Sequence, residues 1–473
     1  MDNVRELALD MLMEILENGA YSHLIIRDVL DKYNYSDSRD KAFVKRVTEG
    51  TLERLIQIDF ILDQFSKVPV SKMKPLIRNL MRMSVYQLLF MDNVPDRAVC
   101  NEAVKLAGKR GFRGLSGFVN GVLRNVARNK ESIRYPQETK EPMKALSIRY
   151  SMPEWLVKLW IEAYGEEKTK AILKGLLQEH PVTVRRREGL SETERAHWLS
   201  TLDTQGVTVK KHPYLSYAYV LSGTEGVKNL PGYEEGMFAV QDVSSMLVVE
   251  AAGMGLEAED RKWTKAAVEV PEDGNLLNPQ QFLVVDVCAA PGGKSMHMAE
   301  RLTGKGKVIA RDLTEYKVSL IRDNKDRMGY ENLEVQVQDA TRLDETLVGK
   351  ADVVLADLPC SGLGIMGKKR DIKYRITREA LAELAGLQKQ ILDVVWQYVK
   401  PGGVLIYSTC TINPEENEKV ADWFASEHPF ELQSLSPYLP EVLKKEGAEG
   451  KLQLLPGVHE TDGFFIAGFR RKS

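Results

Sequence analysis

The sequence predicts a C-terminal α/β domain with a largely parallel sheet, preceded by an all-α domain and a small α+β domain. Three observations support this prediction. Strand-like and helix-like segments alternate through residues 226–473, as they do where helices join parallel strands. Residues 1–130 carry apolar stripes of helical period, and residues 166–225 mix the two patterns. A chain of 473 residues also exceeds the roughly 100–200 residues of one ordinary domain.

Residues 1–130 are predicted to form a bundle of helices. Apolar residues follow the i, i+3, i+4, i+7 spacing of a helix with one buried face. Such stripes occur at residues 4–16, 55–65, 76–87 and 118–126. Residues 131–165 are interpreted as a connector that holds one helix after Pro153.

Residues 166–225 are predicted to form the small α+β domain. Helix-like EEKTKAILKGLLQE and SETERAHWLSTL alternate with strand-like VTVRRR, VTVKKH and AYVLSG. The arginines of VTVRRR (182–187) would stand on both faces of a strand, which a buried sheet face does not readily accept. We therefore expect this strand to form an exposed edge that faces nucleic acid.

The α/β domain, residues 226–473, carries five predicted parallel strands. The first is a continuous apolar run, which is typical of a strand buried on both faces. The strands are FLVVDV (282–287), KVIARD (307–312), LEVQVQD (333–339), ADVVLAD (351–357) and GGVLIYS (402–408). Residues 259–281 show no clear period and are expected to form an exposed excursion.

A small ligand site is predicted where these strands end. The turn CAAPGGK (288–294) follows the first strand and opens a helix, so its backbone can approach a ligand. Asp312, Asp339 and Asp357 end the following strands, at the edge where doubly wound sheets bind nucleosides. Asp312 can hold ribose hydroxyls, and Asp339 with Ala340 can hold an adenine amino edge. Neither GxGxxG nor a Walker pattern is present, which disfavours a dinucleotide or ATP.

Two cysteines follow the last two strands, Cys360 in DLPCSGLG and Cys410 in YSTCTINPEENE. A buried cysteine is usually an inert small hydrophobe, but these lie in polar, turn-rich loops. A thiolate that adds to carbon 6 of a cytosine makes carbon 5 nucleophilic enough to accept a methyl group. That reaction needs a covalent nucleophile, an acid for ring N3 and a cofactor pocket. Cys410, Asp357 and the 288–294 turn can supply these three.

The motifs CAAPGGK, DLPCSGLG and YSTCTINPEENE together resemble the RNA 5-methylcytosine methyltransferase family. The resemblance implies that Cys410 is the nucleophile, that Cys360 assists release of the product, and that Lys294 and Asp357 contact both cofactor and target base. FAVQDVSS (238–245) and TDGFFIAGFRR (461–471) resemble the family's segment before the first motif and its closing hairpin.

The resemblance also implies the fold, the cofactor and the substrate. It implies a Rossmann-like S-adenosylmethionine methyltransferase domain, and it extends to an N-terminal domain that resembles the antitermination factor NusB. The expected substrate is 16S ribosomal RNA, at cytosine 967. The expected cofactor-binding residues are Cys288, Ala289, Ala290, Pro291, Gly292, Gly293, Lys294, Asp312, Asp339 and Asp357.

The charge distribution agrees with an RNA substrate. A net charge of −2 and a pI near 6.5 argue against a protein that coats nucleic acid non-specifically. Basic residues nevertheless gather in clusters, which we interpret as parts of an RNA groove. The clusters are Lys105, Lys109, Arg110 and Arg113; Arg124, Arg128 and Lys130; Arg185–Arg187; Lys210–Lys211; and Lys368–Arg370.

Other features exclude some classes of protein. The four cysteines show no CxxC spacing and histidine is scarce, so we expect no metal site. No apolar run reaches the roughly 18–20 residues of a membrane span, and the N-terminus carries acidic residues where a signal peptide has basic ones. We therefore expect a cytoplasmic, monomeric enzyme that binds no membrane.

Three alternatives remain. The first is the same chemistry on another ribosomal or transfer RNA cytosine. The second is a DNA or protein-amide acceptor, which the cysteine of the STC motif disfavours. The third is an inactive RNA-binding or assembly factor, and the presence of Cys360, Cys410, Asp357 and Lys294 argues against it.

Overall fold

The computed structural model describes residues 4–32, 38–178, 181–224, 226–254, 282–302 and 306–473. The excursion expected at 259–281 lies outside the described residues. The described chain divides into two compact units. One holds the residues up to Gln178 together with Met366–Arg375, and the other holds the rest. No described helix has the length and apolar character needed to cross a membrane.

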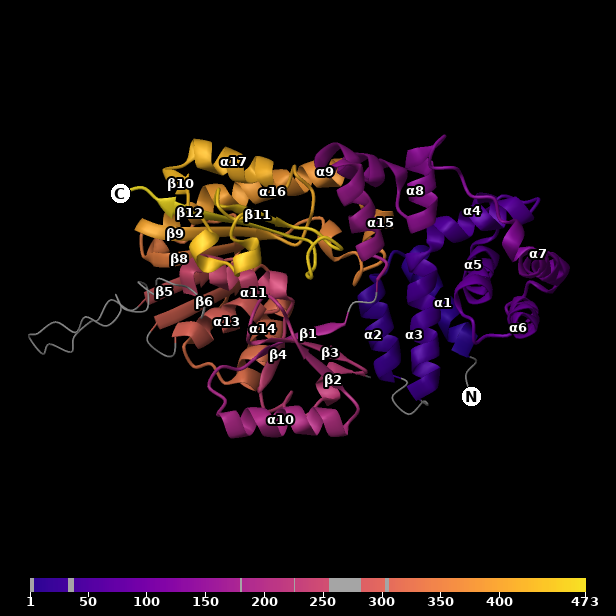
Figure 1. Ribbon diagram of the computed structural model, residues 1–473, viewed down its shortest axis with the longest axis horizontal. Coiled ribbons are helices and arrows are strands. Elements are labelled where there is room, and N and C mark those ends of the chain that lie inside the picture. Colours follow the sequence, from indigo (N-terminus) through magenta and orange to yellow (C-terminus); the bar gives the residue numbers. More distant parts are fainter. Residues whose placement is uncertain (1–3, 33–37, 179–180, 225, 255–281, 303–305) are drawn as a thin grey trace, which may run out of the picture. The chain divides into compact units, whose positions relative to one another are not determined.

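The first unit is helical, as predicted (indigo to purple in Figure 1). One apolar core joins residues from α1 through α7, among them Leu12, Ile58, Leu80 and Leu123. The helices are α1 (Val4–Leu16), α2 (Ser22–Lys32), α3 (Ser38–Glu53), α4 (Leu55–Phe65), α5 (Pro75–Phe90), α6 (Asp96–Lys109), α7 (Ser116–Arg128), α8 (Pro142–Tyr150) and α9 (Glu154–Gly175). Gly165 interrupts α9 with a φ of 79°, a backbone conformation that glycine adopts without strain.

The segment Met366–Arg375, which includes α15 (Ile372–Arg375), belongs to this helical unit. Ser22 Oγ donates a hydrogen bond to Asp371 Oδ1 at 2.5 Å, and Tyr374 donates to the carbonyl of Leu52 at 2.6 Å. Arg370, expected in an RNA-binding cluster, forms ion pairs with Glu49 and Glu53 at 3.0 and 3.5 Å. The sequence does not reveal that a segment between two α/β strands is built into the helical unit.

The second unit begins with a small antiparallel sheet in the order β2-β3-β1-β4. Trp198 and Leu202 of α10 pack against Val184, Tyr219 and Phe238 of this sheet. This confirms the predicted α+β fold. The elements are β1 (Val182–Arg186), α10 (Glu192–Thr204), β2 (Thr208–Lys211), β3 (Ala218–Ser222) and β4 (Phe238–Val240).

The prediction that VTVRRR forms an exposed edge is wrong. Strand β1 pairs on both sides, with β3 and with β4. Arg185 is only 1% exposed, forms an ion pair with Glu300 and donates to Gln241 Oε1 at 2.9 Å. A buried guanidinium is tolerated here because a carboxylate from α13 neutralises it.

The main sheet has the order β10-β12-β9-β8-β5-β6-β7, and β11 pairs with β12. Strands β5 to β9 are parallel, as predicted, while β12 runs antiparallel to β9. The strands are β5 (Phe282–Asp286), β6 (Gly306–Asp312), β7 (Leu333–Val337), β8 (Ala351–Asp357), β9 (Val399–Thr409), β10 (Phe430–Leu432), β11 (Lys451–Leu454) and β12 (Phe464–Arg471).

Helices cover both faces of this sheet (Figure 1). Val284 and Leu355 point into one core, and Val285 and Val354 into another, because successive side chains of a strand face opposite ways. The helices are α11 (Val243–Val249), α13 (Gly293–Leu302), α14 (Glu315–Met328), α16 (Arg378–Val395) and α17 (Glu418–Glu427). The strand order reverses between β5 and β8, which is where open α/β sheets bind ligands at the carboxyl ends of their strands.

Candidate active site

The glycine-rich turn after β5 is tied to the end of the neighbouring strand β6. The amide of Ala289 donates to the carbonyl of Arg311 at 2.8 Å, and that of Ala290 donates to Asp312 Oδ2 at 3.0 Å. Gly292 has a φ of 101°, and a Cβ there would lie 3.1 Å from Ile321 Cγ2. Helix α13 then begins at Gly293, so its free amides face the carboxyl edge of the sheet.

Lys294 and Asp357 form a partly buried ion pair beside this turn. Lys294 Nζ lies 2.7 Å from Asp357 Oδ2, and Ser408 Oγ donates to Asp357 Oδ1 at 2.8 Å. Burial lowers the pKa of Lys294, but the adjacent Asp357 carboxylate outweighs it and holds this pKa above its ordinary value. The ammonium also lies 5.1 Å from the centre of the Phe464 ring. Lys294 therefore keeps its proton in a partly buried site.

Another acid, Asp286, lies at the end of β5. Ser295 Oγ donates to its Oδ2 at 2.5 Å. Burial raises the pKa of Asp286 to about 7, although the hydrogen bond from Ser295 opposes the rise. Asp286 ends a strand, as the predicted acids do, but it was missed because its FLVVDV context indicated only a buried strand.

Cys360 and Cys410 come together although 50 residues separate them. Their sulfur atoms lie 3.3 Å apart, and neither is in a disulfide. The hydrogen bond to Cys410, followed by burial, raises the pKa of Cys360 well above its ordinary value. Cys360 thus keeps its proton, which it can share with the sulfur of Cys410.

The strand-end acids Asp312 and Asp339 differ in their surroundings. Asp312 is 3% exposed, accepts a hydrogen bond from the amide of Leu313 at 2.8 Å and pairs with Lys317 at 3.0 Å. Asp339 Oδ1 accepts from the amide and hydroxyl of Thr341 at 2.9 and 2.7 Å, and these bonds lower its pKa. Asp339 therefore stabilises its own turn, and its Oδ2 lies 3.6 Å from Arg342 Nε.

Cys288 is the first residue of the 288–294 turn. Burial, followed by the charge of Asp312, raises its pKa far above the ordinary value of a thiol. It therefore stays a neutral thiol and does not compete as a nucleophile. Nearby, Leu313 and Val337 are 57% and 46% exposed at the ends of neighbouring strands. Exposed apolar side chains beside a buried carboxylate suit a flat heterocycle joined to a sugar.

The basic clusters of the helical unit are partly neutralised. Lys109, Arg110 and Lys130 pair with acidic side chains at 2.5 to 2.8 Å. Arg113 and Arg128 are exposed. These two arginines are therefore the members of the clusters best placed to meet a phosphate.

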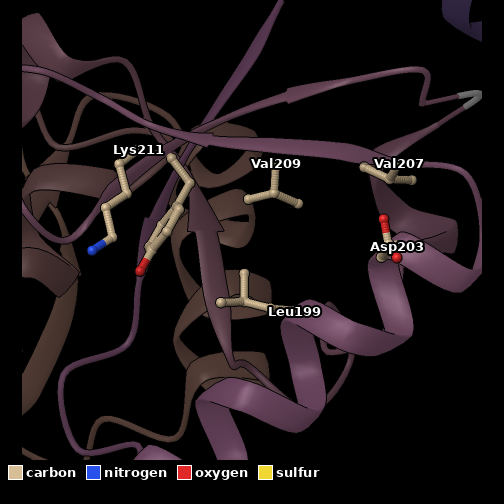
Figure 2. A pocket seen from close by; sticks show the side chains of 6 residues that line it. Leu199, Asp203, Val207, Val209 and Lys211 are labelled. Carbon is tan, nitrogen blue, oxygen red and sulfur yellow. The ribbon is translucent and has the colours of Figure 1, made fainter.

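A cavity of about 290 Å³ lies elsewhere, beside the small sheet (Figure 2). Leu199 of α10 faces Val209 of β2 across it. The lining residues are Leu199, Asp203, Val207, Val209, Lys211 and Tyr219. Lys211 belongs to a predicted basic cluster, and none of them is a predicted catalytic or cofactor-binding residue. Over the described parts of the chain, no group of histidine, cysteine, aspartate and glutamate is arranged to hold a metal ion.

Comparison with known proteins identifies the family. The model of the 16S rRNA methyltransferase RsmB/F family matches residues 275–470. The "Probable ribosomal RNA small subunit methyltransferase B" of Bacillus subtilis is 36% identical over 475 residues, 99% of each chain. The chain belongs to the RsmB/F family. It is therefore a methyltransferase, and the resemblance drawn from its motifs is confirmed.

The remaining comparisons extend the assignment to the other domains. The NusB family model matches residues 2–128, and a ferredoxin-like domain of RsmF/B-like methyltransferases matches residues 152–228. A "Probable ribosomal RNA small subunit methyltransferase B" of Synechocystis is 30% identical over the whole of both chains. The crystal structure of PH0851 has a TM-score of 0.76 at 24% identity and covers 100% of this chain and 99% of its own, which supports the fold.

Proposed function

We propose that this methyltransferase transfers a methyl group from S-adenosylmethionine to carbon 5 of a cytosine in 16S ribosomal RNA, through a covalent bond between Cys410 and carbon 6. The pairing of Cys410 with a protonated Cys360 at 3.3 Å carries the proposal. The family and the small-subunit names of its relatives support the RNA substrate. The resemblance of the motifs supports cytosine 967 as the target.

Residues that fit the cofactor surround the 288–294 turn. When bound, S-adenosylmethionine supplies an electrophilic methyl group. Asp312 would hold the ribose hydroxyls, with Lys317 as its present partner. Leu313 and Val337 would offer apolar surface to the adenine, and the amides that open α13 would suit the carboxylate of the cofactor.

The attack step uses Cys410 together with Lys294 and Asp357. The Cys410 thiolate forms a bond to carbon 6, and the electron pair of the carbon 5–carbon 6 double bond becomes available at carbon 5. Ring N3 takes up a proton as this happens. We assign that proton to the Lys294–Asp357 pair, whose atoms lie 2.7 Å apart. Carbon 5 then accepts the methyl group.

The release step uses Cys360. Once Cys410 sulfur is bonded to carbon, its charge and most of its hydrogen-bonding capacity are lost, which removes the largest cause that raises the pKa of Cys360. The Cys360 thiolate removes the carbon 5 hydrogen as a proton, and the electron pair left behind re-forms the carbon 5–carbon 6 double bond. The bond to Cys410 breaks with its electron pair on the sulfur, and ring N3 returns its proton to the Lys294–Asp357 pair. The contact with Cys410 thus keeps Cys360 protonated before attack, and its loss after attack lets Cys360 act as a base.

Single cysteine variants test these roles. Cys410→Ala should abolish methylation and form no adduct with RNA. Cys360→Ala should attack and methylate, then accumulate a slow-migrating protein–RNA adduct on a denaturing gel. Cys100→Ala, which changes a buried cysteine of the helical unit, is the matched control and should behave as the wild type. An adduct in Cys410→Ala with none in Cys360→Ala would reverse the assigned roles.

Bisulfite sequencing of RNA from a deletion strain tests the substrate. We expect one 5-methylcytosine to disappear from 16S ribosomal RNA, at cytosine 967, and to return when the wild-type chain is expressed. If a 5-methylcytosine of another ribosomal or transfer RNA site disappears instead, the proposed reaction stands and the proposed target is wrong.

A further inference from the structure

The loop that carries Cys360 is held by a buried carboxylate that belongs to the loop after Cys410. Glu416 is fully buried and accepts hydrogen bonds from the amide and hydroxyl of Ser361 at 2.8 and 2.5 Å. It also accepts from Asn413 Nδ2 at 2.9 Å and from Gln388 Nε2 at 3.3 Å. Thr411 Oγ1 also donates to it, at 3.5 Å, so five donors from three separate segments meet on one side chain.

These contacts fix the backbone on both sides of Cys360. Glu416 holds the amide of Ser361, the residue that follows the cysteine. Gln388 Nε2 donates to the carbonyl of Pro359, the residue that precedes it, at 3.0 Å. Tyr407 in turn donates to Gln388 Oε1 at 3.1 Å, so Gln388 is itself oriented. The sulfur of Cys360 can move by little more than rotation about its own side-chain bonds.

The same carboxylate also holds the loop of Cys410. Asn413 lies three residues after the nucleophile, and Thr411 Oγ1 lies 2.7 Å from Ser361 Oγ. Burial raises the pKa of Glu416, while the hydrogen bonds from Ser361 and Asn413 lower it. A buried carboxylate needs such donors, because leaving a buried acceptor or charge without partners costs more than each bond contributes. The two loops are consequently tied to each other through Glu416.

We propose that Glu416 is a positioning residue that sets the separation of the two sulfur atoms and, through it, the rate of product release. The proposal rests on the proposed function, because release is the step assigned to Cys360. Glu416 touches neither cysteine sulfur in the described contacts and acts through Ser361, Asn413 and Gln388. Release depends on Cys360 reaching the hydrogen on carbon 5, and a shift of about 1 Å in such a group can cost about a hundredfold in rate.

The variants follow from the contacts. Glu416→Ala removes all five of these hydrogen bonds, whereas Glu416→Gln keeps the shape and one acceptor oxygen. In Glu416→Gln the side chain can turn its oxygen towards the rigid amide of Ser361, while the Ser361 hydroxyl and the Asn413 amide can reorient. Glu416→Gln should therefore rescue much of the function. Glu415→Ala, at an exposed neighbour that pairs with Lys419, is the matched control.

The first experiment separates attack from release on the full-length enzyme with its RNA. In Glu416→Ala the single-turnover rate of methyl transfer should stay within about threefold of wild type, while the adduct fraction at steady state rises about tenfold or more. Adding Glu416→Ala to Cys360→Ala should change the adduct little, because both act on one step. A loss of methyl transfer without adduct, or a further additive rise in the double variant, would overturn the proposal.

The second experiment measures the sulfur pair without RNA. Phenylarsine oxide bridges two close thiols and binds single thiols only weakly. Native mass spectrometry counts the bound reagent. Wild type and Glu415→Ala should bind it, Cys360→Ala and Cys410→Ala should lose it, and Glu416→Ala should bind about tenfold more weakly. This readout holds even if no RNA adduct ever forms, so failure of the proposed function and failure of the positioning role remain distinguishable. Wild-type arsenical binding by Glu416→Ala would refute the positioning role.

Discussion

Replacing Lys373 should change how the stability of the protein depends on pH. Lys373 Nζ donates hydrogen bonds to the carbonyls of Glu53 at 2.8 Å and Ser151 at 2.6 Å, at the C-terminal ends of α3 and α8. The side chain is 5% exposed. Burial lowers its pKa from 10.5 to about 7, although the charge of Glu53 opposes this. The partial negative charge at a helix C-terminus stabilises a cation, but here the cost of removing the ammonium from water is larger.

The sign follows from proton uptake. Between pH 7 and 10.5 the unfolded chain binds a proton on this lysine that the folded chain does not, so the free energy of unfolding rises with pH. At about 1.4 kcal/mol for each tenfold change in proton affinity, the full difference is about 5 kcal/mol. This gain in the free energy of unfolding is complete above pH 10.5 and is lost as the pH falls to 7. Water that reaches the site would reduce it, so about 5 kcal/mol is an upper limit.

Urea unfolding at several pH values measures this effect. The difference in unfolding free energy between wild type and Lys373→Met should grow by about 1 kcal/mol or more for each pH unit from 7.5 to 9.5. The methionine variant should also carry a constant cost, because two carbonyls lose their donor. Lys74→Met, at an exposed lysine of the same unit, should show no such growth. Parallel pH profiles for wild type and Lys373→Met would refute the reasoning.

Three further predictions concern the cofactor, the RNA and the packing of the small sheet. Asp312→Ala should weaken S-adenosylmethionine binding by about 1–3 kcal/mol in calorimetry, because a charged hydrogen bond to the ribose is lost; wild-type affinity would remove Asp312 from the site. Replacing Arg113 and Arg128 together by glutamine should make the fall of log RNA affinity with log salt concentration less steep, by about 1.5–2 in slope. An unchanged slope would exclude both from the RNA surface. Arg185→Met should cost about 3–5 kcal/mol in urea unfolding, since Glu300 stays buried without its partner, and adding Glu300→Gln should recover part of that loss. If Arg185→Met lowers the free energy of unfolding no more than a substitution at an exposed residue does, the buried Arg185–Glu300 ion pair is contradicted.

Local patterns in the sequence were enough to predict the three folds and to name candidate site residues, whose roles stay predictions. The predicted strands at 307–312 and 351–357 match β6 and β8, because apolar runs of that length have few alternatives. Cys360 and Cys410 could be placed together because each follows a parallel strand, and β8 and β9 are neighbours. Asp286 and Glu416 were missed, although Glu416 stands within the quoted NPEENE motif.

The sequence by itself determined which chemical groups are available and at which edge of the sheet they lie, since strand direction and turn composition are local properties. Only the tertiary structure decided which of those groups are buried and with what partner. Arg185 is paired because Glu300 reaches it from 115 residues away. Cys360 keeps its proton because Cys410 lies 3.3 Å from it, and residues 366–375 join the helical unit through contacts to Ser22 and Leu52. Burial and charge state depend on such distant partners, because the cost of desolvating a polar group is offset only by the group that meets it in space.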